Sequence, residues 1–151
     1  MDIQSFLQEN HASRMELSEI IAGLDERALQ TVTRPGWSVA ATLYHLAFWD
    51  QRALACLQQW ERGGEIGAGR LDSQAIHSIN QAVHAISQAV PVSAAVQFAL
   101  ESASAVDGYL AHAGQEFLGQ LLAAGLERYV RRSLHRREHL GSISEALAQP
   151  R

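Results

Sequence analysis

Lysine is missing from this chain of 151 residues, and cysteine and proline are scarce. The single cysteine, Cys56, excludes a framework of disulfides within the chain and is typical of a reducing compartment. All 12 basic residues are arginine, and 16 acidic residues outnumber them, so the formal net charge is −4. This balance argues against a surface that binds nucleic acid or anionic membranes as a whole.

Long apolar runs are also absent. No stretch approaches the ~18 residues of a membrane-spanning helix, and residues 1–5 are too polar and acidic for a secretory signal. We therefore expect a soluble cytoplasmic protein that binds neither membranes nor nucleic acid. The length is typical of one domain, residues 1–151, which buries roughly 70% of its unfolded surface. Such a core needs no structural metal, so a bound ion would be available for function.

Prolines and glycines divide the chain into segments with helical periodicity and no recognisable strand. The pattern predicts four long helices at about residues 2–29, 38–62, 91–114 and 126–147, with Ser38 and Ser93 as candidate N-caps. Shorter helices are expected at about 72–88 and 116–123. Four long helices indicate an all-α four-helix bundle. The long 63–92 connection would allow the second and third long helices to run parallel.

The most informative residues are histidines. His135 and His139 are four residues apart, so on a helix they share one face with Cβ atoms ~5–6 Å apart and could converge on one cation. About 0.3 such pairs are expected by chance among 7 histidines, so two solvated histidines are the alternative interpretation. The pair lies near the apolar sector of its helix, close to Ile143 and Ala146, where a neutral imidazole needs a partner.

His45 lies in the most apolar part of the second long helix, within the sequence LYHLAFW of residues 43–49. Taken alone, it would be a core histidine bonded to a backbone or hydroxyl group. With a histidine pair on another core helix, it becomes a natural third ligand. Three protein ligands leave positions on a divalent ion open for water or substrate, as in catalytic metal sites.

Two segments resemble a known family. Residues 36–40 (GWSVA) and 45–49 (HLAFW), with Arg52, are similar to the first metal motif of the DinB-like helical bundles. Residues 134–143 (LHRREHLGSI) are similar to the family's C-terminal motif, two histidines separated by three residues. The superfamily includes YfiT-type metal-dependent hydrolases and mycothiol-dependent maleylpyruvate isomerases.

The resemblance implies an up-down-down-up four-helix bundle with a short extra helix in its second connection. It implies one divalent ion, such as zinc or nickel, on His45, His135 and His139, and a homodimer. It further implies a metal-dependent enzyme acting on small electrophilic substrates, either a hydrolase or a transferase that uses a low-molecular-weight thiol. Because some members have no demonstrated activity, a non-catalytic metal-binding or dimeric interaction bundle is the alternative.

Arginines near the candidate ligands suggest how a substrate would bind. Arg132 and Arg128 precede His135 by three and seven residues, and Arg52 follows His45 by seven, so all three are expected on the ligand faces. We interpret them, with Trp49, as a substrate-binding rim for a carboxylate. The alternatives are a salt-bridged surface with Glu127 and Glu138 as partners, and a core or interface role for Trp49.

The sequence leaves the nucleophile open between metal-bound water and thiolate, and it assigns no catalytic side chain. Cys56 is interpreted as a small core residue. Glu138 is expected to point away from the ligands and is not assigned as a base. His77 and His84 are expected to be exposed, or else to lie over the mouth of the site, where one of them would be a fourth ligand in a sequestering protein.

Overall fold

The computed structural model describes residues 2–150, and this part of the chain is helical apart from turns and one isolated bridge between Val32 and Ser38. All-α architecture is therefore confirmed. The described helices are α1 (Ile3–Ala22), α2 (Glu26–Gln30), α3 (Val39–Glu61), α4 (Ser73–Ser87), α5 (Val92–His112), α6 (Gln115–Ala123), α7 (Glu127–Val130) and α8 (Ser133–Ala148). No described helix is long and apolar enough to cross a membrane.

Local capping chemistry explains where several helices begin. The hydroxyl of Ser38 accepts a hydrogen bond from the Ala41 amide at 3.0 Å, so the predicted start of α3 is confirmed. Asp72 caps α4 in the same way. The predicted cap at Ser93 is wrong. Pro91 occupies the N-cap position of α5 and Ser93 lies inside the helix, because the fixed φ of proline suits a helix start and its missing N–H costs nothing there.

The first and last long segments are each interrupted, contrary to the sequence prediction. The first divides into α1 and α2, and the last divides into α7 and α8 at Arg131 and Arg132. At the second break, the side-chain amide of Asn10 on α1 donates to the Val130 carbonyl at 2.8 Å and accepts from the Ser133 amide at 2.9 Å. Asn10 thus gives hydrogen-bond partners to the backbone groups that the break leaves unpaired. The helix can therefore be interrupted in the core without the free-energy cost of unpaired buried backbone groups.

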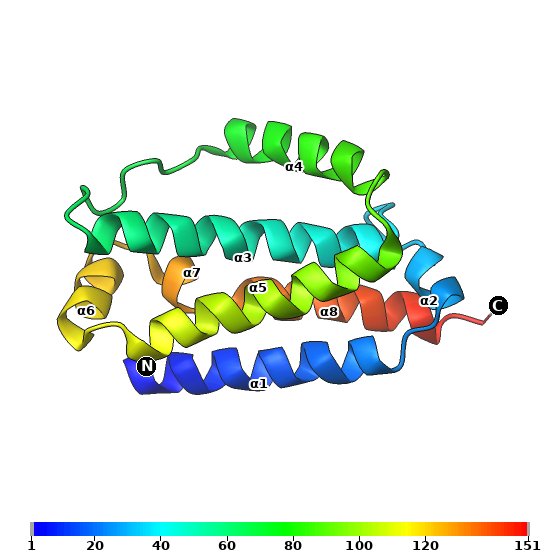
Figure 1. Ribbon diagram of the computed structural model, residues 1–151, viewed down its shortest axis with the longest axis horizontal. Helices are drawn as coiled ribbons and strands as arrows, with labels where there is room; N and C mark the ends of the chain where they lie inside the picture. The colour runs from blue at the N-terminus through cyan, green and yellow to red at the C-terminus, as the bar shows by residue number, and fades with distance from the viewer. Residues whose placement is uncertain (1, 151) are drawn as a thin grey trace.

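Four long helices pack side by side in Figure 1, with α1 and α8 running in one direction and α3 and α5 in the other. The shorter α4 lies outside this group, over α3, and only Val83 and Ser87 among its residues are buried. A hydrogen bond of 2.9 Å from the indole nitrogen of Trp49 on α3 to the side-chain oxygen of Asn80 ties α4 to the bundle.

The core consists of two apolar clusters. One contains Leu17, Leu43, Leu46, Leu140 and Ile143, and the other contains Phe6, Leu57, Leu110, Leu118 and Val130. Buried polar side chains on α1, α3 and α5 and at the start of α8 form a group that we call the polar layer; it comprises Asn10, Ser13, Asp50, Asp107, Arg132, Ser133 and Arg136. On α3 and α8, each candidate metal ligand lies within five residues of a member of this layer.

Candidate metal centre

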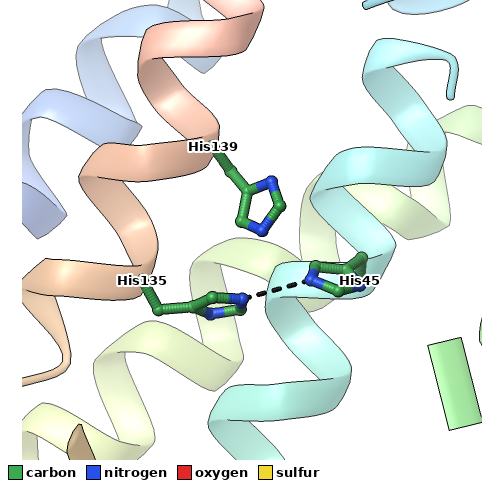
Figure 2. A group of neighbouring side chains, drawn as sticks. All are labelled: His45, His135 and His139. Atoms are coloured by element: carbon green, nitrogen blue, oxygen red, sulfur yellow. Dashed lines mark hydrogen bonds between the residues drawn. The ribbon is translucent and has the colours of Figure 1, made fainter. Parts of the chain in front are cut away.

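The three predicted ligands meet between two helices. His45 projects from α3, and His135 and His139 project from α8, so that the three rings face one another in Figure 2. The ring centroids are 5.1 Å apart for His45 and His135, 4.6 Å for His45 and His139, and 4.7 Å for His135 and His139. One nitrogen from each ring lies within 4.8 Å of the others. The tertiary structure therefore brings together the residues that the sequence singled out.

The spacing of the nitrogens is compatible with a divalent ion. Two nitrogens that each bind one ion at ~2.0–2.1 Å, at tetrahedral or octahedral angles, lie about 2.9–3.4 Å apart. The Nε2 atoms of His45 and His135 are 3.1 Å apart. Within residues 2–150, no fourth histidine, cysteine, aspartate or glutamate joins this group. The donor set therefore fits a site with three protein ligands.

Burial keeps these imidazoles in the form that binds metal. Burial, together with a smaller effect of the nearby His139, lowers the pKa of His45 to about 3. The pKa of His135 is lowered well below its ordinary value by burial and by the nearby charge of Arg132. Burial also lowers the pKa of His139. All three side chains are neutral at pH 7, and neutral imidazole is the metal-binding form.

The contact between the Nε2 atoms of His45 and His135, which lie 3.1 Å apart, supports the same interpretation. The Nδ1 atoms of these two rings are buried and have no hydrogen-bond partner among the described residues, so the Nε2 atoms carry the interactions of both rings. The contact between the two Nε2 atoms can be a hydrogen bond only if one donates and the other accepts, so it leaves His139 without a role. A cation that accepts a lone pair from one nitrogen of each ring would give all three rings a partner.

Aromatic side chains and the polar layer hold the ligand rings. Trp37 contacts the His45 ring edge-on at 5.0 Å between centroids. On α8, Arg136 is fully buried next to His135, and its guanidinium binds both oxygens of Asp107 at 2.7 and 2.8 Å and one oxygen of Asp50 at 3.2 Å. These bonds restrict the rotation of α8, so that His135 and His139 face α3.

This ion network was not predicted from the sequence. Asp50 accepts from Nε of Arg132 at 2.9 Å as well as from Arg136, and Asp107 also pairs with Nε of Arg14 at 3.2 Å. The available signal was a lone aspartate immediately after the apolar run 43–49, since a charge on a core face needs a partner. The identity of that partner, on another helix, was not available from local pattern.

A cavity of about 380 Å³ opens beside the three histidines. Its walls combine cationic, apolar and amide side chains, which is typical of small-molecule sites. The residues that line it together with the histidines are Trp49, Arg52, Ala53, Ile76, Asn80, Arg128, Tyr129, Arg132 and Glu138. All four residues predicted to contact substrate are in this set.

The four predicted substrate-binding residues differ in their surroundings. Arg52 donates to the hydroxyl of Tyr129 at 3.0 Å and to the carbonyl of Gly69 at 2.7 Å, and it lies over the ring of Trp49. Arg128 belongs to α7 rather than to the ligand helix, because the chain breaks before Ser133. It nevertheless lines the cavity, exposed and 3.6 Å from Glu138. Arg132 is buried against Asp50.

Other predicted candidates lie outside the ligand group. His77 on α4 is exposed, and His84 packs against Trp37 with 4.6 Å between ring centroids. Cys56 is half-buried beside the second apolar cluster. Glu138 also lines the cavity, but it does not join the group of three histidines. Its ion pair with Arg128 directs it toward the cavity rim.

The lowered pKa values predict how the metal-free protein responds to acid. Because the pKa of each of these histidines is lower in the folded than in the unfolded chain, the unfolded chain takes up protons on them more readily as the pH falls below 6.5, so the unfolding free energy falls with the pH. The slope is up to about 1.4 kcal/mol per pH unit for each fully neutral histidine. Urea denaturation with a chelator present would measure it. We expect His45→Gln to flatten this slope and His77→Gln to leave it unchanged; equal slopes in all three proteins would contradict the assignment.

Comparison with known proteins supports the motif resemblance. The family model described as DinB superfamily matches residues 9–143. Searches of curated proteins and of solved structures found no match. The matched region contains all three candidate ligands and nearly all of the described helices. The chain therefore belongs to the DinB superfamily.

Proposed function

We propose that the protein binds one divalent metal ion through His45, His135 and His139 and uses it in an enzymatic reaction on a small electrophilic substrate. The observation that carries the proposal is the convergence of three neutral imidazoles at the wall of a cavity. Zinc and nickel suit imidazole ligands. Membership in the DinB superfamily is consistent with such a site.

When bound at such a site, a divalent ion makes water or a thiol a nucleophile at neutral pH. The residues of the chain then have separate tasks. The histidines would hold the ion without adding negative charge, so that its full charge would act on water, thiol or substrate. Trp49 and Ile76 form an apolar wall, and Arg52, Arg128 and Arg132 supply positive charge to a substrate. Hydrolysis and transfer from a low-molecular-weight thiol both fit this arrangement.

The sequestering alternative receives less support than the enzyme. A storage or sequestering site benefits from a closed set of ligands, whereas catalytic sites keep a position open. In the described part of the chain, neither His77 nor His84 joins the three histidines, and the group lines a cavity. Both observations favour an ion that a substrate can reach.

Metal stoichiometry tests the proposal directly. Protein purified without a histidine tag should bind one zinc or nickel ion per chain in a calorimetric titration. At a free ion concentration 100 times the Kd, the unfolding free energy should rise by about 2.7 kcal/mol. Removal by a chelator should reverse the rise. Failure to bind either ion, together with unchanged melting, would reject the metal site.

Turnover tests the enzymatic part. The metal-loaded protein should consume an activated ester, or an electrophile together with a bacterial thiol, and His139→Ala should lose this activity while remaining folded.

We further propose an up-down-down-up arrangement, supported by the helix directions in Figure 1, and a single domain over residues 1–151. A homodimer and a cytoplasmic location are part of the same proposal.

A further inference from the structure

The cavity beside the histidines has an excess of positive charge. Three arginines line it, Arg52, Arg128 and Arg132, and two carboxylates pair with them, Glu138 with Arg128 and Asp50 with Arg132, so positive charge remains in excess. Electrostatic interactions are stronger in a cavity partly shielded from water than in bulk water, so charges that line such a cavity favour a ligand of opposite sign. The occupant that this wall suits is an anion.

Hydrogen bonding distinguishes the three arginines. Both terminal nitrogens of Arg52 already have acceptors, the Tyr129 hydroxyl and the Gly69 carbonyl. Arg128 is about two-thirds exposed, with a side-chain exposure of 69%, and pairs loosely with Glu138. Exposed charges of this kind contribute little to binding, because water screens them. Neither residue is a strong anchor for a ligand.

Arg132 differs from both. Its side chain is only 7% exposed; its Nε donates to Asp50 at 2.9 Å and its Nη1 donates to the Arg128 carbonyl at 2.8 Å. Its Nη2 is buried and has no acceptor among the described residues. Two of the three guanidinium nitrogens thus fix the group in place at the cavity wall, and the third has an unused donor whose burial is costly unless a ligand accepts from it.

We propose that this cavity binds a small monocarboxylate, whose carboxylate accepts a hydrogen bond from Nη2 of Arg132 while its short apolar body lies against Trp49 and Ile76. The proposal rests on the proposed function in that the carboxylate belongs to the substrate of the metal-dependent reaction. A guanidinium nitrogen binds a carboxylate or a phosphate, but only a carboxylate with an apolar chain also has a part that packs against Trp49 and Ile76. The volume of about 380 Å³ admits a molecule of this size.

Binding of butyrate to the metal-free protein tests the inference apart from the metal site. The probes are butyrate, neutral butyramide and inorganic phosphate, titrated calorimetrically at constant ionic strength with a chelator present. We expect butyrate to bind at least ~10-fold more tightly than butyramide, which equals about 1.4 kcal/mol. Phosphate should bind no more tightly than butyrate. Equal affinities for butyrate and butyramide, or tighter binding of phosphate, would overturn the proposal.

Variants locate the anchor. Arg132→Gln should lose the preference for butyrate over butyramide, whereas Arg131→Gln, a neighbouring arginine that pairs with Glu9 away from the cavity, should keep it. If Arg132→Gln does not fold, the butyrate affinities of Arg52→Gln and Arg128→Gln show whether either of these arginines is the anchor instead. Both should keep at least a third of the butyrate affinity, and loss of binding in either would assign the anion to that arginine instead. Zinc binding measured on the same samples separates this result from failure of the metal site.

Discussion

Replacing Arg136 by methionine is expected to lower the free energy of unfolding by about 3–5 kcal/mol, which is the usual cost of leaving buried charges without their partner. The guanidinium is fully buried and binds two aspartates, Asp50 and Asp107, that are themselves 2% and 8% exposed. Methionine approximates the length of the arginine stem but supplies no charge. The two carboxylates would then remain in the core with fewer partners. Chemical denaturation at pH 7 measures the change.

Arg137→Met is the matched control for this prediction. Arg137 is the next residue on α8, and its guanidinium pairs with Glu16 at 3.3 Å on the surface, where the two side chains are 44% and 47% exposed. Exposed ion pairs contribute about 0–1 kcal/mol, so this variant should unfold close to the parent protein. A similar loss in both variants would show that position on α8, rather than the buried charge, is responsible.

The same network should influence the metal site only through geometry. Arg136 is adjacent in sequence to His135 but points into the polar layer, while the imidazole points toward α3. A substitution of Arg136 that still folds would loosen the rotation of α8. Its consequence for metal binding would therefore be smaller than the removal of a ligand.

Replacing His135 by alanine is expected to weaken divalent metal binding by at least ~100-fold. Loss of residues that merely support a ligand costs 10–100-fold in affinity, and removal of a ligand itself should exceed this. The Nε2 atom of His135 lies 3.1 Å from that of His45, so the variant leaves only two nitrogens near the ion. Competition against a chromophoric chelator, with tag-free protein, measures the affinity.

His84→Ala is the matched control for the ligand variant. His84 is a partly buried histidine on α4 that packs against Trp37, which in turn contacts His45, yet it lies outside the ligand group. Metal affinity should change by less than about threefold, equivalent to ~0.6 kcal/mol. A large loss in this variant, or none in His135→Ala, would remove the basis for the assigned ligands. Folding of both variants is checked by their helical circular dichroism.

The predictions from sequence were most successful where local rules decide the outcome. The start of α3 followed from the hydroxyl of Ser38, which satisfies a backbone N–H three residues ahead. The shared face of His135 and His139 followed from helical periodicity, which holds wherever the helix is continuous. These features depend on residues within one or two helical turns of each other, so the sequence alone can predict them.

Predictions failed where distant residues compete with local preference. Helical periodicity continues through Arg131 and Arg132, but the helix breaks there. Asn10, more than a hundred residues earlier in the chain, forms hydrogen bonds with the backbone groups that the break leaves unpaired. The cap at Ser93 failed for a local reason, since Pro91 already begins the helix. The partner of Asp50 could not be identified, because any of several arginines on the last segment was available to it.

The amino-acid sequence alone determined an all-helical chain of the DinB superfamily and the three histidines that could bind a metal, because helix periodicity and short motifs are local properties. Only the tertiary structure decided that the rings converge, that a cavity lies beside them, and that Arg132 is buried against Asp50 rather than exposed. The physical reason is that burial and ion pairing are set by which helices pack together, and that choice depends on the whole core at once.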